Sequence, residues 1–254
     1  MKLEVSENCT GCGTCVRDCP VGALMVKDGK VAARKPEECI DCKHCVAVCP
    51  VGAIAVNGVG AADCGAIGKT PDPEEVRNLI RQRRSIRQYA AEELAKAEIA
   101  ELVATLDYAP TGCNARATRF IVIDSRAKMA EIKTKLVELL KSKFKDLPEF
   151  LRGPVIAVTK KPEADPFFRG APHLLIVEAG EGAVTPYEDC VAACAYFDVL
   201  AQGCGYGTTW CGFLKMIVDA VPEAASLFGL ASGRPFYAML FGRAAVSYPR
   251  NVVR

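Results

Sequence analysis

The chain has 254 residues, of which 50% are apolar and 24% are charged, a composition typical of a globular protein rather than a disordered one. The formal net charge is only +2, so neither nucleic acid nor a membrane surface is indicated as a partner. The sequence contains no apolar run of 18 residues and no signal-like start, and we therefore expect a cytoplasmic protein without a membrane segment.

The first part of the chain contains an internal repeat of cysteines. Residues 9–20 and 39–50 each read C-x2-C-x2-C-x3-C-P. Three thiolates on a tight loop can reach three corners of one iron–sulfur cubane, and a fourth, on a helical turn that proline ends, points toward another cluster. Both runs resemble the bacterial ferredoxins that hold two [4Fe–4S] clusters. Such clusters need a reducing compartment, which again favours the cytoplasm.

The resemblance to two-cluster ferredoxins implies a ligand set for each cluster. One cluster would be held by Cys9, Cys12, Cys15 and Cys49, and the other by Cys39, Cys42, Cys45 and Cys19. A pair of zinc sites is the alternative, because C-x2-C pairs also supply zinc ligands. The third cysteine and the Cys-Pro ending, which occur twice, favour iron–sulfur. Short strands are expected to frame the loops at residues 3–5, 24–26, 30–32 and 54–56.

A stretch rich in Gly and Ala and without periodicity, residues 59–72, is interpreted as a linker between a ferredoxin domain (1–58) and a second domain (73–254). Asp72 and Pro73 then predict the start of a helix. This helix leads into a basic run, Arg83-Arg84-Ser85-Ile86-Arg87. The run has two interpretations: a solvated helix end, or guanidinium groups and a hydroxyl that bind a phosphate.

The rest of the second domain mixes helices with strands. Helices are predicted at residues 92–106, after an N-cap at Ser125, and at residues 187–202, where the sequence is apolar nearly all round. Strands are predicted at residues 119–124, 155–159, 174–177 and 235–242. A turn-rich loop contains Cys113, for which a small packing residue is the favoured interpretation and the border of a substrate face is the other.

Four stretches of the second domain resemble, in the correct order, the motifs of FMN-dependent nitroreductases. They are Arg83-Arg84-Ser85-x-Arg87, Ala109-Pro110-Thr111-x-x-Asn114, Gly205-Tyr206-Gly207-Thr208-Thr209-Trp210-Cys211-Gly212, and the tail from Gly242 to Arg254. None is specific alone, but the four in sequence are a strong signal. Two departures occur: Arg116-Ala117 stands where Gln-Pro is usual, and Arg243-Ala244 stands where Tyr-Pro is usual.

The resemblance to nitroreductases implies an FMN site. In the family, the first stretch grips the phosphate and ribityl chain, the second meets the flavin ring, and backbone amides of the third lie along its N5 edge. The cofactor-binding residues that this implies are Arg83, Arg84, Ser85, Arg87, Pro110, Thr111, Asn114, Thr209, Trp210, Cys211, Gly212, Arg250 and Arg254. No catalytic side chain is assigned, and Cys113 and Arg116 are the candidates for the substrate face.

Together the resemblances imply an α+β protein: a small two-cluster ferredoxin-like domain, then a nitroreductase-like FMN domain with a central, mostly antiparallel sheet flanked by helices. The implied function is an iron–sulfur flavoprotein oxidoreductase that passes electrons from two [4Fe–4S] clusters to FMN and on to a nitroaromatic, a quinone or an activated alkene. The implied partners are a second copy of the chain, as a homodimer, and an electron donor, either ferredoxin or NAD(P)H. The alternative function is a non-catalytic electron carrier or redox sensor that binds FMN and serves a partner protein.

Overall fold

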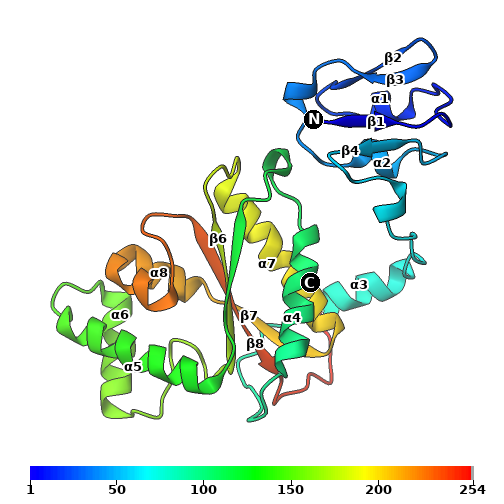
Figure 1. Cartoon of the computed structure of the whole chain (residues 1–254). Helices are drawn as coiled ribbons and strands as arrows, with labels where there is room; N and C mark the ends of the chain where they lie inside the picture. Colours follow the sequence, from blue (N-terminus) through cyan, green and yellow to red (C-terminus); the bar gives the residue numbers. More distant parts are fainter. Residues whose placement is uncertain (253–254) are drawn as a thin grey trace. The chain divides into compact units, whose positions relative to one another are not determined.

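A computed structural model describes residues 1–252 and divides the chain into two compact units (Figure 1). Unit 1 spans Met1–Thr70, and unit 2 begins at Pro71. This division falls inside the stretch interpreted as a linker, while the domain limits 1–58 and 73–254 remain predictions. Within the described residues, no helix combines the length and the apolar character that crossing a membrane requires.

Unit 1 consists of two small antiparallel ribbons and two short helices. β1 (Leu3–Val5) pairs with β4 (Ile54–Val56), and β2 (Leu24–Lys27) pairs with β3 (Lys30–Ala33). Each cysteine loop runs into a helix, α1 (Thr14–Asp18) or α2 (His44–Ala47), and a 3-10 turn, η1 (Pro36–Glu38), precedes the second loop. All four strands predicted here are therefore confirmed within one residue at each end.

The core of unit 1 is small and lies between the ribbons and the helices. It contains Leu24, Val31, Val46, Ile54 and Val56, and partly buried cysteines pack against it. A core of this size in so short a chain is typical of domains that depend on bound metal for much of their stability.

Unit 2 begins with α3 (Pro73–Gln82), which starts as the sequence predicts, after the 3-10 turn η2 (Ala61–Asp63) in the preceding stretch. The Asp72 side chain accepts a hydrogen bond of 2.7 Å from the backbone N–H of Glu74, and Pro73 occupies the first helical position.

A four-stranded sheet forms the centre of unit 2. It consists of β5 (Thr118–Ile123), β6 (His173–Ala179), β8 (Phe236–Arg243) and β7 (Tyr206–Trp210), in that order, and all neighbours are antiparallel. The predicted α+β class and the mostly antiparallel sheet are confirmed.

Helices cover both faces of this sheet (Figure 1). Because side chains alternate along a strand, Leu174 and Ile176 of β6 enter one core while Leu175 and Val177 enter the other. The first core packs against α5 (Arg126–Ser142), α6 (Glu149–Lys160), α8 (Gly212–Ala220) and the 3-10 segment η5 (Pro222–Phe228). The second packs against α4 (Lys96–Ala104), η3 (Thr105–Tyr108) and α7 (Pro186–Gly203).

Two of the predicted elements differ from the structure. The strand predicted at residues 155–159 is wrong, because this segment is the second half of α6. Its β-branched residues favour a strand locally, but Leu151, Val155 and Val158 recur at helical spacing and are buried together against α5. The helix predicted at residues 92–106 is shorter as an α-helix and continues as η3.

Candidate functional site

One cavity in unit 1 is lined by cysteines from both halves of the repeat. Its lining includes Cys9, Cys12, Cys15 and Cys49, the set that the sequence assigns to one cluster. Cys15 lies on α1, whereas Cys49 follows α2, so the fourth sulfur comes from the second motif. Four thiols around one space are the donor set that a [4Fe–4S] cluster requires, so the residues present fit the group.

The backbone of unit 1 is shaped to approach these sulfurs. The backbone N–H of Ala53 donates to Cys49 Sγ and that of Ala23 donates to Cys19 Sγ, each at 3.3 Å. These two pairs are equivalent positions of the repeat, so Cys19 and Cys49 have matching surroundings. Gly11 has φ +64°, and a Cβ there would lie 2.2 Å from the Gly29 carbonyl oxygen, so the first loop requires glycine at this position.

Among these cysteines, Cys15 is buried and Cys45 is partly buried. Burial raises the pKa of Cys45 to about 11 and also raises the pKa of Cys15. Since a metal binds the thiolate, ligation at these two positions has to displace a proton, and cluster assembly should therefore be disfavoured at low pH.

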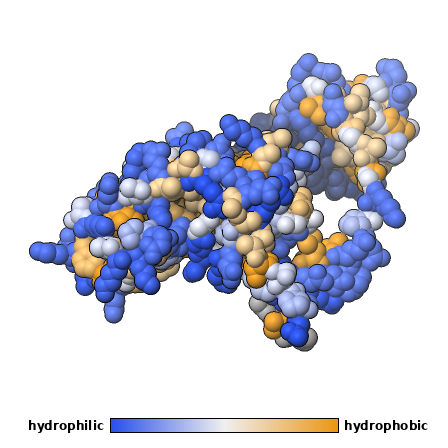
Figure 2. Space-filling model, turned by 90° about the horizontal axis from the view of Figure 1, so that it is seen from below, coloured by the Kyte–Doolittle hydropathy of each residue, from blue (hydrophilic) through white to orange (hydrophobic). Residues whose placement is uncertain are grey.

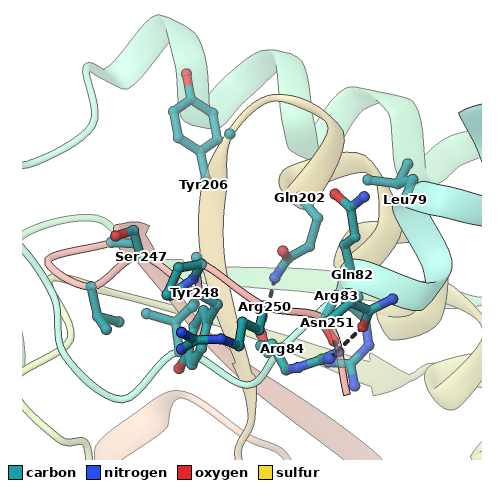
Figure 3. Close-up of a pocket in the computed structure, with 16 residues that line it drawn as sticks. Leu79, Gln82, Arg83, Arg84, Gln202, Tyr206, Ser247, Tyr248, Arg250 and Asn251 are labelled. Atoms are coloured by element: carbon teal, nitrogen blue, oxygen red, sulfur yellow. Dashed lines mark hydrogen bonds between the residues drawn. The ribbon is translucent and has the colours of Figure 1, made fainter. Parts of the chain in front are cut away.

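Unit 2 has a cavity of about 470 Å³ with several cations on its walls (Figure 3). Three segments far apart in the sequence form it: the end of α3 with the basic run, the end of α7 with the start of β7, and the C-terminal tail. Arg83, Arg84 and Arg250 all line it. A pocket with three guanidinium groups is suited to an anionic group such as a phosphate.

Arg83 is the cation of this cavity that pairs with a buried carboxylate. Its Nη1 atom is buried and makes no hydrogen bond, although it lies 3.5 Å from Asp198 Oδ2. The separation is short enough for charge attraction but the pair lacks hydrogen-bond geometry, so a donor is left unsatisfied. Asp198 is itself 5% exposed in its side chain and accepts hydrogen bonds from the Thr208 hydroxyl and from Trp210 Nε1. The Arg83 side chain as a whole is 29% exposed and lines the cavity, so its charge is available to an anion there.

The basic run is held in place by β7 and α7. The N–H of Ile86 donates to the Thr208 carbonyl at 2.8 Å, and Gln202 Nε2 donates to the Arg84 carbonyl at 3.2 Å. The close approach requires glycine at position 207, because a Cβ there would lie within 2.8 Å of Ile86 atoms. Arg84 Nη2 also donates to Asn251 Oδ1 at 2.6 Å and so ties the C-terminal tail to the basic run (Figure 3).

The loop at residues 109–116 contains a second polar cluster, organised by Asp189 near the start of α7. Asp189 is 3% exposed, and its Oδ1 accepts from the Gly112 N–H at 2.9 Å and from the Thr185 hydroxyl at 2.6 Å. Its Oδ2 is buried without a hydrogen-bond partner. The turn η4 (Gly112–Asn114) follows, and Cys113, Asn114 and Arg116 all have positive φ. Non-glycine residues in this conformation are strained and cluster at functional sites.

Comparison with family models assigns both units. The model described as a 4Fe–4S dicluster domain matches residues 8–53, and that of the nitroreductase family matches residues 80–243, more than half of the chain. The chain belongs to the nitroreductase family. Its N-terminal unit is a 4Fe–4S dicluster domain, so both resemblances found in the sequence are confirmed. We call unit 1 the ferredoxin unit and unit 2 the nitroreductase unit.

Solved structures agree on the fold of the nitroreductase unit. A Bacteroides fragilis nitroreductase with bound FMN is 20% identical, with 71% of this chain and 95% of that chain covered and a TM-score of 0.58. A Desulfitobacterium hafniense nitroreductase with bound FMN is 21% identical (71% and 94% covered, TM-score 0.54). An FMN-dependent nitroreductase from Clostridium difficile is 19% identical (72% and 98% covered, TM-score 0.51). A comparison with curated protein sequences found no significant match.

The nitroreductase unit does not bring all the predicted flavin residues together. Arg83, Arg84 and Arg250 share the cavity, whereas Pro110, Thr111 and Asn114 lie in the loop held by Asp189. Asp189 and Gln202 mark the two places on α7, and the thirteen helical steps from one to the other span about 20 Å. Within one chain, the predicted phosphate and ring contacts are therefore separated.

Several other predicted residues lie outside the cavity lining. Ser85 bridges to Thr208, and Arg87 is exposed and donates to the Ser85 carbonyl at 3.4 Å. The third stretch is engaged by the fold: Thr209 donates to the Ile86 carbonyl, and the Cys211 N–H donates to the Ala238 carbonyl at 2.8 Å. Gly212 begins α8, and Trp210 packs edge-on against Tyr237. Arg254 lies outside the described residues.

The two candidates for the substrate face also have definite surroundings. Cys113 is exposed, so the favoured interpretation of a packing residue is wrong; a bend that needs positive φ turns the residue outward instead. Arg116 Nη2 donates to the Asp107 carbonyl at 2.6 Å, and its N–H donates to the Thr111 hydroxyl at 3.0 Å. Arg116 therefore stabilises the loop.

Some residues of the site carried no motif in the sequence. Gln202 and Asn251 line the cavity, Asp198 pairs with Arg83 behind it, and Asp189 organises the other loop. A polar residue on a helix that is otherwise apolar, as Asp189 and Asp198 are on α7, is the one signal that pointed to them, because buried carboxylates need partners.

Proposed function

We propose that the chain is an iron–sulfur flavoprotein oxidoreductase in which electrons enter at the ferredoxin unit and leave through the nitroreductase unit to an organic acceptor. The observation that carries this proposal is the presence, in one chain, of a cavity lined by four cysteines and a cavity lined by three arginines. The family membership of each unit supports it.

We further propose FMN as the cofactor of the nitroreductase unit. Two solved relatives are described with bound FMN, and the three arginines that line one cavity support an anionic group in this chain. When bound, a flavin accepts electrons singly and delivers them in pairs, which connects iron–sulfur chemistry to reduction of an organic molecule. Of the chain's own residues, Arg83, Arg84 and Arg250 would bind the phosphate.

Asp198 and Gln202 have positioning roles in this proposal. Asp198 attracts the Arg83 guanidinium to one side of the cavity without hydrogen-bonding its Nη1, and Gln202 fixes the backbone at Arg84. Preorganised cations of this kind bind a phosphate with little loss of side-chain freedom. We assign no side chain as a proton donor.

The site is proposed to be completed by a second copy of the chain. The two groups of predicted flavin residues lie about 20 Å apart along α7, too far to meet across one ligand edge within one chain. Large apolar side chains are exposed on α3 and α7: Val76 (38%), Ile80 (57%), Tyr196 (50%) and Val199 (38%). Figure 2 shows hydrophobic patches interrupting one otherwise hydrophilic face. A homodimer would cover such patches and join the two groups of residues.

Anaerobic stopped-flow spectroscopy tests the function. The full chain, reduced with dithionite, is mixed with a nitroaromatic, a quinone or an activated alkene, and cluster and flavin absorbance are followed separately. Rapid, saturable reoxidation by at least one acceptor is expected, with turnover when the donor is in excess. A carrier would instead give slow reoxidation whose rate rises linearly with the concentration of every acceptor. It would react fast only with a protein partner. Substituting NAD(P)H or reduced ferredoxin for dithionite identifies the donor.

A further inference from the structure

The two cysteine motifs of the ferredoxin unit form an internal control, because the same backbone carries different side chains at matching positions. Thr14 and Arg17 of the first motif correspond to His44 and Ala47 of the second. Any difference between the two sulfur environments that involves these side chains is therefore a property of this chain and not of the motif.

In the first motif a chain of hydrogen bonds ends on a sulfur. The Thr14 hydroxyl lies 3.4 Å from Cys12 Sγ, and Arg17 donates to Thr14 Oγ1 at 3.2 Å and to the Cys12 carbonyl at 3.1 Å. A metal-bound thiolate carries no proton, so in the assembled protein the hydroxyl has to be the donor. Arg17 leaves it free for this role, because it occupies only an oxygen lone pair.

In the second motif the corresponding groups are engaged elsewhere. His44 Nδ1 lies 3.4 Å from Asp18 Oδ2, and the His44 side chain is 65% exposed. The cation of this motif, Lys43, is paired with Asp41 and donates to the Val56 carbonyl at 2.9 Å. Its charge is thus offset by a neighbouring carboxylate, whereas the described residues contain no ion pair to Arg17.

We infer that Thr14, positioned by Arg17, raises the reduction potential of the cluster held by Cys9, Cys12, Cys15 and Cys49 above that of the other cluster. The inference rests on the ligand sets of the proposed function. Adding an electron increases the negative charge on the cluster and its sulfurs, and a hydrogen-bond donor and a nearby cation both stabilise that state. At equilibrium, the first electron taken from dithionite therefore resides on the first-motif cluster.

A redox titration of the full chain, followed by electron paramagnetic resonance, tests this inference. In Thr14→Val the equilibrium constant for reducing the cluster of higher potential should decrease tenfold. For one electron, this lowers that potential by about 59 mV. Thr14→Ser keeps the hydroxyl and should restore the wild-type potential. Arg17→Gln should produce a smaller fall, because Arg17 is exposed and its charge is screened.

A reciprocal variant and a control complete the test. His44→Thr combined with Ala47→Arg should raise the lower potential toward the higher one, and Lys27→Gln, which removes an exposed charge outside both motifs, should change neither. A fall in the lower potential in Thr14→Val, or no change in either, would overturn the inference. Iron content distinguishes a failure of the ligand sets from a failure of the inference about Thr14. Loss of iron from every variant would argue against the ligand sets, whereas full iron content with unchanged potentials would argue only against the role of Thr14. If Thr14→Val alone loses iron, the potentials of Arg17→Gln and of the reciprocal variant decide whether the inference holds.

Discussion

The two units of this chain differ in how closely one copy brings the predicted binding residues together. In the ferredoxin unit, four sulfurs from both halves of the repeat line one cavity. In the nitroreductase unit, the cavity holds the arginines, while the loop with Asn114 lies at the other end of α7. A site defined by close sequence spacing is completed by local folding, whereas one assembled from distant segments can be left for a second copy to complete.

The largest expected effect comes from replacing Cys19 or Cys49, the fourth ligands that each motif contributes to the cluster of the other. Cys49→Ser should abolish the cluster of the first motif, and Cys19→Ser that of the second, because each fourth ligand belongs to the opposite motif. Each variant should keep about half of the wild-type iron, measured by iron analysis, and should lose a different paramagnetic signal. Loss of the same signal in both variants would contradict the crossover.

The arginine cavity provides the next largest effect. Arg83→Ala should weaken FMN binding by about 1.5–3 kcal/mol, roughly 10- to 150-fold, because a charge-assisted bond to a partly buried phosphate is lost. Fluorescence titration of the deflavinated protein measures it. Arg77→Ala is the matched control, since Arg77 is exposed on α3, the helix that precedes Arg83, and pairs with Glu74; it should leave the affinity unchanged. Equal affinities in all three proteins would place the phosphate elsewhere.

Arg87→Ala should have a smaller effect than Arg83→Ala. Its side chain is exposed and lies outside the cavity lining, so water screens any attraction to a phosphate. The same fluorescence titration compares the two variants, and a larger loss for Arg87→Ala would shift the proposed phosphate site toward that residue.

The smallest expected effect is on the stability of the nitroreductase unit, and it depends on pH. Burial lowers the pKa of His173, whose Nε2 accepts the Leu94 N–H at 2.9 Å. Glu93 and Asp124 nearby favour its protonation, and Arg126 opposes it. The unfolded chain therefore binds the proton more readily, so the stability from neutral His173 is complete above about pH 6.5 and decreases as the pH falls below it.

Thermal unfolding at pH 7.5 and pH 5.5 measures this dependence for the nitroreductase unit. His173→Gln retains an acceptor for Leu94 but does not titrate, so its melting temperature should decrease less over the same interval. An identical decrease in the variant and the wild type would assign the pH dependence to other groups.

The elements predicted correctly from the sequence are those whose signals are local. The strands that frame the cysteine loops and the caps at Asp72 and Ser125 depend on neighbouring residues, and all are present. The strand predicted at residues 155–159 failed because packing against α5 outweighs the preference of β-branched residues.

The unpredicted parts of the site depend on contacts between distant residues. Gln202 reaches back 118 positions to the Arg84 carbonyl, and Asn251 accepts from Arg84 across 167 positions. No spacing rule contains such pairs, and the outward turn at Cys113 likewise results from positive φ at a non-glycine residue. The motifs located the segments of the site, while the fold determined which of their residues face the cavity.

The central claim, that one flavin site is shared between two copies, can be tested most directly by mixing two defective chains. Arg83→Ala and Asn114→Ala chains carrying different tags are co-expressed, and the mixed dimer is purified through both tags. One of its two sites then combines an intact Arg83 with an intact Asn114 from the other copy, and the other site carries both defects. The account predicts about half of the wild-type FMN content and little FMN in either parent. A mixed dimer with no more FMN than its parents would contradict it.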